Sequence, residues 1–241
     1  MHLPHDAVVR QNVSSPSGES IAHIRAFTML QLHYYPSNAS MAPHIVLETL
    51  GVPFELKLVD RTRAAHKTAE YLQMNPNGLI PVLVDGDLVM YEAAAICLHL
   101  ADLHPEAALA PPPGTAARAQ FYKWLMWMTN TVQATLIVYF YPERWADTPE
   151  ARAQVKAHAE AKVGAMLDQL EAELARHGQP FLLGDSFCVA DAYALMLCRW
   201  TRGFARPARS LPSLGAYLQR LLALPAVQRV FAREELAQPW V

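Results

Sequence analysis

Hydroxyl groups gather in a short segment directly before a predicted helix. Tyr34, Tyr35, Ser37 and Ser40 lie in the string YYPSNAS, and the residues after it have helical periodicity. The N-terminus of a helix favours an anion, and a nearby hydroxyl can donate a further hydrogen bond to it. The segment is therefore a candidate site for an anionic group of a ligand; the alternative is that its serines are turn and cap residues.

Basic side chains gather in a second segment, before a predicted short helix. Arg61, Arg63, His66 and Lys67 lie within seven positions of one another. Such a cluster suits a carboxylate of a ligand, and solvated surface charge is the alternative for each member.

The cysteines and histidines follow no metal-finger or disulfide pattern. Cys97, Cys188 and Cys198 form no CxxC pair and lie in apolar helical segments, and the 10 histidines are scattered. We therefore expect neither a metal site nor a disulfide framework. Free cysteines are typical of a reducing compartment, so we predict a cytoplasmic protein.

The composition argues against several classes of protein. The chain has 241 residues, 52% hydrophobic and 17% charged, with a formal net charge of −2, as expected for an ordered protein of one large or two modest domains. The uncharged stretch 124–142 has polar residues in its middle, which favours a buried helix over a membrane span. Arginines are concentrated in 192–233, but no aromatic-interleaved basic groove accompanies them, so we expect no nucleic-acid partner.

The hydrophobic patterns predict an α/β domain followed by an all-α domain. Residues 1–28 are predicted to be a disordered tail. Strands near 30–35 and 54–60 flank a helix over 40–50, and a helix over 68–74, two strands around Asp85-Gly86-Asp87 and a helix over 92–103 follow. This order predicts a small mixed sheet covered by helices in a domain of residues 29–107.

A Pro-rich linker at 108–114 is predicted to lead into an α-helical bundle at 115–241. Its helices are expected over 115–141, from Thr148-Pro149, from Val189, and near Ser213 and Ala226. Cys188 is the expected N-cap of the third helix, and Asp191 at N3 would complete a capping box. Asp191 is therefore predicted to be a folding residue.

Several strings of the chain resemble one enzyme superfamily in the right order. They are SNASMAPHIVLETLGVPFEL, NPNGLIPVL, YEAAAICLHLADLHPEAAL, GDSFCVADAYAL and LPSLGAYLQRLLALPAVQRVF. From about residue 30 to the end, the sequence resembles the glutathione transferase superfamily, and its opening is similar to the bacterial beta class. The resemblance implies a thioredoxin-like N-terminal domain and an all-α C-terminal domain. It also implies a homodimer that uses glutathione as co-substrate, without a metal or organic cofactor.

The resemblance assigns roles within the hydroxyl-bearing segment. Ser37 falls at the thiol-contacting serine of the delta, theta and zeta classes, and we favour it as the catalytic donor. Ser40 is the second hydroxyl candidate, with capping of the next helix as its simplest role. The beta-class cysteine falls on Ala39, so mixed-disulfide chemistry is excluded there.

The resemblance also implies how the rest of glutathione is bound. Ile80-Pro81 is similar to the family's cis-proline step, whose first residue bonds the cysteinyl backbone. Glu92 would bind the γ-glutamyl ammonium. Ala93 stands where the family usually has Ser or Thr, which leaves only a backbone N–H for the γ-glutamyl carboxylate. His66 and Lys67 would bind the glycine carboxylate.

The first helix of the C-terminal domain is expected to form the second-substrate pocket. Trp127, Asn130, Tyr139 and Arg144 are the candidates, the last two for an oxygen of the electrophile. Gln133 falls where the beta class has a useful histidine, so a proton-transfer role is lost there.

These residues predict a transferase that joins the glutathione thiolate to an electrophilic, apolar small molecule. Two alternatives remain open. Ala39, Ala93 and Gln133 together allow a non-catalytic binding protein on the same fold. A glutathione-dependent isomerase or dehalogenase would need the same glutathione site with another second pocket.

Overall fold

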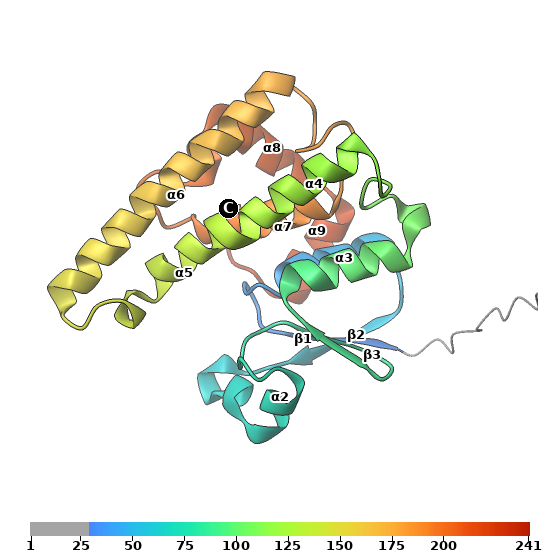
Figure 1. Cartoon of the computed structure of the whole chain (residues 1–241), viewed down its shortest axis with the longest axis horizontal. Helices are drawn as coiled ribbons and strands as arrows, with labels where there is room; N and C mark the ends of the chain where they lie inside the picture. The colour runs from blue at the N-terminus through green and yellow to red at the C-terminus, as the bar shows by residue number, and fades with distance from the viewer. Residues whose placement is uncertain (1–28) are drawn as a thin grey trace, which may run out of the picture.

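The computed structural model describes residues 29–241, and the predicted tail at 1–28 lies outside the described residues. Within them, a sheet with its helices comes first and a set of helices follows (Figure 1). The order of elements agrees with the prediction of a thioredoxin-like domain followed by an α-helical one.

The sheet has four strands in the order β2-β1-β3-β4. They are β1 (Leu30–Tyr34), β2 (Phe54–Leu58), β3 (Val82–Asp85) and β4 (Leu88–Tyr91). β1 is parallel to β2, because a helix connects them, and antiparallel to β3. β3 and β4 form a tight hairpin whose turn begins at Gly86, with φ 61°.

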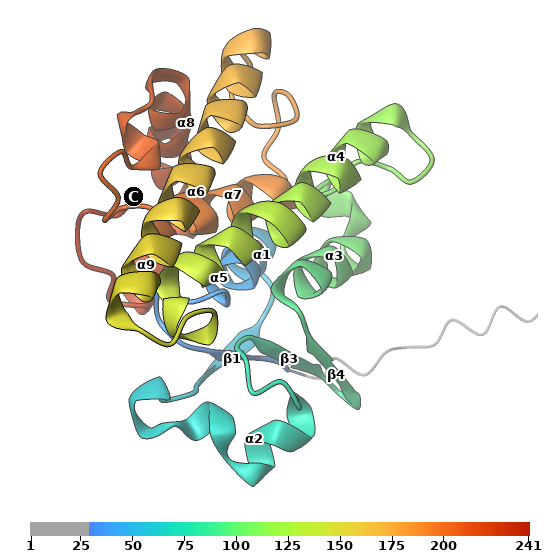
Figure 2. The ribbon, with the colours of Figure 1, turned by 60° about the vertical axis from the view of Figure 1, so that its left-hand side comes forward.

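Helices cover the two faces of the sheet unequally. α1 (Met41–Leu50) and α3 (Ala93–Leu103) pack together, and α1 also contacts the helical part. α2 (Ala69–Met74) lies on the opposite side of the sheet (Figures 1 and 2). α1 ends at Gly51, as predicted, because its φ of 66° suits glycine.

The C-terminal part contains α4 (Ala116–Trp127), α5 (Ala134–Phe140), α6 (Pro149–His177), α7 (Val189–Trp200), α8 (Pro212–Leu222) and α9 (Pro225–Arg233). Short 3-10 turns occupy Arg61–Arg63, Ala65–Lys67, Pro105–Ala107, Pro142–Arg144 and Ala208–Ser210. Thr148 accepts a hydrogen bond from the Ala151 N–H, so the predicted cap of α6 is confirmed. In the part of the chain from residue 29 on, no helix is long and apolar enough to cross a membrane.

The single helix predicted over 115–141 is interrupted by a π-helical stretch at Met128–Gln133. The hydroxyls of Thr129 and Thr135 donate to the carbonyls of Met126 and Thr131 at 2.9 and 2.7 Å, competing with the regular backbone bonds. A π-helical turn adds residues without advancing the helix normally, so it rotates the faces of the helix that follows. Periodicity counted from α4 therefore misplaces the residues of α5.

The N-terminus of α7 is a fully buried polar junction. Asp191 is fully buried, and its Oδ2 accepts the Cys188 N–H at 2.8 Å. Its Oδ1 accepts the Leu182 N–H at 2.9 Å and the Tyr217 hydroxyl at 2.7 Å. Burial raises the pKa of Asp191, and these hydrogen bonds oppose that shift. The predicted folding role of Asp191 thus extends from α7 to α8.

An ion cluster joins α1 to α9. Both Arg229 Nε and Arg233 Nη1 lie 2.6 Å from the carboxylate of Glu48, which is 8% exposed. Burial raises the pKa of Glu48, but the hydrogen bonds from the two arginines outweigh it, and the net pKa is lowered.

Glu48→Gln is expected to lower the stability at pH 7 by about 1 kcal/mol, because both arginines are partly solvated. A lowered pKa in the folded state means that this contribution is complete above the ordinary value of 4.5 and is lost as the pH falls through the folded value. Thermal melts of parent and variant should therefore differ at pH 7 and converge as the pH falls through the lowered pKa of Glu48. Glu55→Gln, on exposed β2, is the control. A difference in melting temperature that stays constant with pH would show that the charge of Glu48 is not what stabilises the fold.

Candidate active site

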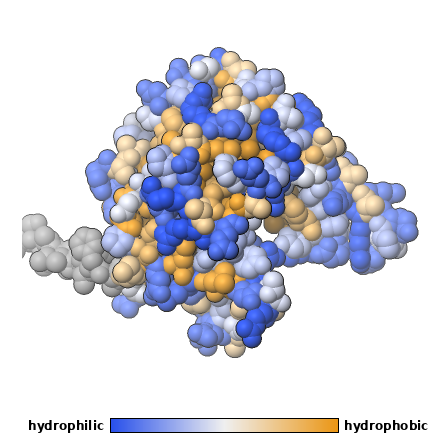
Figure 3. Space-filling view, turned by 180° about the vertical axis from the view of Figure 1, so that it is seen from behind, coloured by the Kyte–Doolittle hydropathy of each residue, from blue (hydrophilic) through white to orange (hydrophobic). Residues whose placement is uncertain are grey.

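A cavity of about 370 Å³ lies between the sheet-containing part and the helical part. Its two walls consist of Ser37, Asn38, Ala39, Arg61, His66, Lys67, Gly78, Leu79 and Ile80 on one side, and Gln133, Ile137, Phe140, Tyr141, Arg144, Trp200 and Arg202 on the other. Seen from behind, the surface is hollowed where the arm formed by the ends of α5 and α6 meets the lower part (Figure 3). The volume suits a small ligand.

Ser37 lies in the turn between β1 and α1, and the helical part holds it on three sides. Its N–H donates to Glu234 Oε2 at 2.9 Å, its carbonyl accepts Trp200 Nε1 at 3.2 Å, and its Oγ accepts Arg199 Nε at 3.3 Å. The backbone φ of Ser37 is 60°, an uncommon value for a residue other than glycine. These contacts stabilise that conformation beside the cavity.

Arg199 and Glu234, which position Ser37, are each 3% exposed. Burial and the charge of Arg202 lower the pKa of Arg199 to about 10, so its guanidinium stays charged at neutral pH. Arg199 also donates to the carbonyls of Pro239 and Trp240, and Glu234 Oε1 lies 2.8 Å from His44 Nδ1. The sequence analysis missed both residues, because nothing local marks them as neighbours of the loop.

Ser40 does not have the capping role predicted for it. Its hydroxyl donates to the Tyr35 carbonyl at 3.1 Å and accepts the Tyr35 N–H at 3.3 Å, and its side chain caps no N–H of α1. The backbone of Ser40 is already helical, with φ −63° and ψ −18°, whereas a capping residue is usually extended. Ser40 is fully buried and does not line the cavity, so its hydroxyl serves the loop itself.

The Ile80-Pro81 peptide bond is cis, as predicted. Ile80 lines the cavity, and the preceding residue is fixed by two hydrogen bonds. The Tyr71 hydroxyl and Asn75 Nδ2 both donate to the Leu79 carbonyl at 2.8 Å. The segment that would contact the backbone of a peptide ligand is therefore held by α2.

His66 and Lys67 also line the cavity. Lys67 Nζ donates to the Gly78 carbonyl at 3.2 Å, and Gly78 has a φ of 58°. His66 Nδ1 is buried and has no hydrogen-bond partner within residues 29–241. Burial and the charges of Lys67 and Arg61 lower the pKa of His66, which favours its neutral form. A ligand could supply the missing partner of this nitrogen.

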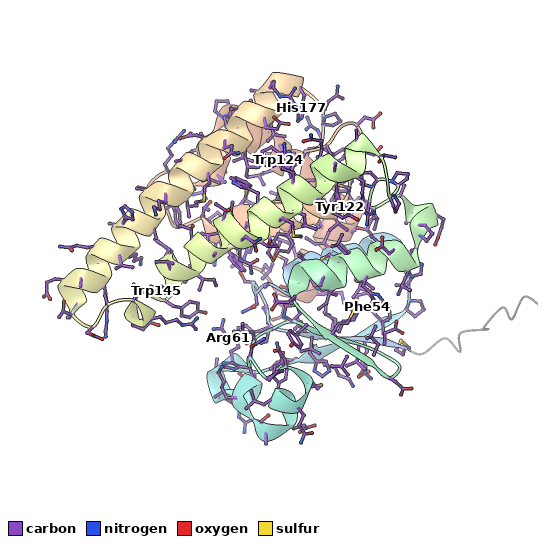
Figure 4. All side chains as sticks on the ribbon, in the orientation of Figure 1. Phe54, Arg61, Tyr122, Trp124, Trp145 and His177 are labelled. Atoms are coloured by element: carbon purple, nitrogen blue, oxygen red, sulfur yellow. The ribbon has the colours of Figure 1, made fainter. Side chains whose placement is uncertain are left out.

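Arg61 bridges the two walls of the cavity. Its Nη2 donates to the Tyr141 hydroxyl at 2.8 Å. Figure 4 shows it rising from the segment before α2 toward the end of α5. The basic segment predicted from sequence thus reaches the helical wall.

Glu92 and Ala93 lie at the start of α3 and outside the lining of the cavity. Glu92 is exposed, has a φ of 75°, and forms no ion pair with any residue that the structure describes. Its charge nevertheless reaches Tyr193, because burial, Cys97 and Glu92 together raise the pKa of that tyrosine. Tyr193 in turn donates to Gln133, a lining residue. Glu92 is thus linked to the lining only indirectly, through Tyr193 and Gln133.

Only one of the four predicted second-pocket residues lines the cavity, namely Arg144. Trp127 packs edge-on against Trp124 at 5.3 Å, and Asn130 is exposed. Tyr139 packs against Phe204 at 4.5 Å. The π-helical turn accounts for Tyr139, since it rotates α5 so that other side chains face the cavity, whereas Trp127 precedes this turn and Asn130 lies within it. The sequence analysis missed the lining residues Ile137, Phe140, Trp200 and Arg202.

Comparisons with known proteins agree with this architecture. Residues 29–102 match the family model "Glutathione S-transferase, N-terminal domain", and residues 126–225 match "Glutathione S-transferase, C-terminal domain". Glutathione S-transferase GST-4.5 of Xanthomonas campestris is 30% identical over 86% of this chain and all of its own length. Glutathione S-transferase 3 of Zea mays is 36% identical over 80% of this chain and 89% of its own. The chain belongs to the glutathione S-transferase family.

Solved structures extend this family likeness to three dimensions. The transferase superimposes on a glutathione transferase homologue from Sulfitobacter, with bound glutathione, with a TM-score of 0.79 at 26% identity. That match covers 86% of this chain and 99% of the other. A glutathione transferase from Methylococcus capsulatus gives a TM-score of 0.74 at 36% identity, over 87% and 100% of the two chains. The fold predicted from the sequence is thus confirmed.

Proposed function

We propose that this transferase activates the thiol of glutathione at Ser37 for attack on an electrophilic small molecule. The observation that carries the proposal is the contact between Arg199 Nε and Ser37 Oγ. An arginine can only donate hydrogen bonds, so Ser37 Oγ is the acceptor in this contact. The single hydroxyl proton of Ser37 is then free to donate to a thiolate in the cavity, which lowers the pKa of the thiol.

The charges around the cavity support one orientation of glutathione. Glu92 and the N-terminus of α3, which lie outside the lining, would bind the γ-glutamyl ammonium and, through the Ala93 N–H, its carboxylate. Lys67 and His66 contribute to the lining, where they would bind the glycine carboxylate. Ile80 lies beside the cis bond and would contact the cysteinyl backbone. In this orientation the thiol faces Ser37.

Several further features belong to the same proposal. The transferase would act as a homodimer with no cofactor beyond glutathione, and its opening would be beta-class-like with Ala39 at the cysteine position. Cys97, Cys188 and Cys198 are all free, which supports a reducing, cytoplasmic setting. The domain boundaries at 108–114 stay a prediction.

Conjugation of glutathione to 1-chloro-2,4-dinitrobenzene, together with retention on immobilised glutathione, tests the proposal. Both are expected for the purified chain. Retention without conjugation of this or any other electrophile would favour a glutathione-binding protein instead. Absence of both retention and conjugation would show that the chain does not bind glutathione at the proposed site.

Glu92→Gln should raise the KM for glutathione by about tenfold with little change in kcat, because a charge-assisted hydrogen bond contributes about 1.5–3 kcal/mol. Gln keeps the size of the side chain at this positive φ, so the strain is unchanged. Glu106→Gln, beyond the other end of α3, is the matched control and should leave KM unaltered. Equal kinetics for Glu92→Gln and the parent would exclude the ammonium-binding role.

A further inference from the structure

The lining of the cavity is strongly cationic. Arg61, Lys67, Arg144 and Arg202 all contribute to it, and no Asp or Glu does. Within residues 29–241, none of the four forms an ion pair with an acidic side chain. Their side chains contact the Tyr141 hydroxyl and ring, the Tyr35 ring, the Gly78 carbonyl and the Arg199 carbonyl. An electrophile that is wholly apolar would offer these four positively charged side chains no anionic partner.

Glutathione accounts for only part of this charge. It has two carboxylates and one ammonium, and in the proposed orientation its carboxylates lie at the N-terminus of α3 and at His66 and Lys67. Those groups all belong to the sheet-containing part. Arg144 and Arg202 belong to the opposite wall, in the 3-10 turn after α5 and in the turn after α7. They remain available to a second molecule.

The apolar part of the same wall lies with these two arginines. Ile137, Phe140 and Trp200 line the cavity, and Phe140 packs edge-on against Trp200 with their rings 6.2 Å apart. A wall with an aromatic surface and two guanidinium groups is complementary to a molecule with an apolar body and one anionic group. Guanidinium groups bind carboxylates particularly well, because the two groups can form paired hydrogen bonds.

Two basic groups, His66 and Arg199, have pKa values that are lowered in part by positively charged neighbours. Burial and then the charges of Lys67 and Arg61 lower the pKa of His66. Burial and then the charge of Arg202 lower the pKa of Arg199 to about 10. Both shifts agree with a positive potential that would draw an anion into the cavity.

We propose that the second substrate is an electrophile that has an apolar body and a carboxylate, and that Arg202 and Arg144 bind the carboxylate. The proposal rests on the proposed function of this site. For an α,β-unsaturated ketone, the thiolate sulfur forms a bond to the β-carbon, and the π electrons of the alkene move to give an enolate. The enolate then takes a proton from water at the α-carbon, so no group leaves.

Ethacrynic acid and its methyl ester provide the test, because they share the reacting enone and differ in the remote carboxylate. We expect the parent enzyme to use the acid with a kcat/KM at least about tenfold higher than the ester, after subtraction of the uncatalysed rate. Arg202→Gln and Arg144→Gln should each lose about tenfold or more of kcat/KM with the acid. With the ester, both should stay within about twofold of the parent, as should the KM for glutathione.

Arg206→Gln is the matched control for net charge. Arg206 is exposed in the same segment as Arg202 but bonds to Asp168, away from the lining. This variant should keep the preference for the acid. Thermal melts of all variants separate loss of fold from loss of recognition, and Arg144, being exposed, is the variant least able to disturb the fold.

Four results would overturn the inference. Equal or better use of the ester by the parent would show that the carboxylate is not recognised. A higher KM for glutathione in Arg202→Gln, measured with the ester, would show that the arginine binds glutathione instead. Conjugation of 1-chloro-2,4-dinitrobenzene without conjugation of the acid would reject the substrate class and leave the proposed function intact. Absence of conjugation with every electrophile would reject the proposed function, and the inference with it.

Discussion

Asp191→Ala should destabilise the folded protein by about 3–5 kcal/mol, the largest loss expected from a single substitution here. The carboxylate accepts three hydrogen bonds in a fully buried site, from the Leu182 N–H, the Cys188 N–H and the Tyr217 hydroxyl. Alanine leaves all three donors without a partner and without access to water. Each such donor costs about 1–3 kcal/mol. The capping box alone would account for only part of the loss.

Urea denaturation of the parent and the variant gives the measurement. Asp185→Ala, an exposed neighbour, is the control and should change the stability little. If Asp191→Ala does not fold, Tyr217→Phe removes one of the three donors and should cost about 1 kcal/mol. The folded fraction should keep the parent's KM for glutathione. Loss of binding without loss of stability would instead place Asp191 in the active site.

Ser37→Ala should lower kcat/KM by about 10- to 100-fold near pH 6.5, with much of the loss recovered at alkaline pH. The hydroxyl lowers the pKa of the bound thiol, so its removal returns that pKa toward its ordinary value of about 8.5. Above that pH the thiol ionises unaided, and the two enzymes should converge. The pH–rate profile and the ultraviolet absorbance of the bound thiolate both report the shift.

Two further variants separate the hydroxyl from the backbone at this position. Ser37→Gly also removes the hydroxyl but suits the φ of 60°, so a shift shared by both variants belongs to the hydroxyl. Ser40→Ala should cost stability, because it removes the two hydrogen bonds to Tyr35, and should leave the thiol pKa unchanged. A pKa shift carried by Ser40→Ala alone would reverse the assignment. No shift in any variant would assign the thiolate to Tyr34, Tyr35 or backbone N–H groups.

The sequence was most informative where structure depends on near neighbours. Gly51 ends α1, Thr148-Pro149 begins α6, and Asp191 stands three residues after its N-cap, because each effect acts within one turn of a helix. The hairpin of β3 and β4 likewise depends on a two-residue turn. These local effects specify the order of the elements, and the resemblance to known transferases specifies the fold.

Local patterns failed where one helix changes its geometry. Tyr139 was predicted to face the second pocket as part of a single helix over 115–141. The π-helical stretch at Met128–Gln133 rotates the residues after it, so Ile137 and Phe140 line the cavity instead. The predicted capping role of Ser40 was also wrong. The tight turn before α1 gives Ser40 a helical backbone, and its hydroxyl bonds to Tyr35 instead of capping α1.

The sequence, through its resemblance to known transferases, identified Ser37 as a candidate donor and the basic segment at residues 61–67 as a candidate anion site. Only the tertiary structure decided what holds Ser37, because Arg199 and Glu234 are 162 and 197 positions away along the chain. Neither residue has a local signal, since an arginine late in one helix and a glutamate at the end of another are ordinary helix-terminal residues. Packing of α7 and α9 against α1 brings both to the loop. In the proposed function, the Arg199 contact that this packing creates leaves the serine proton to the thiolate.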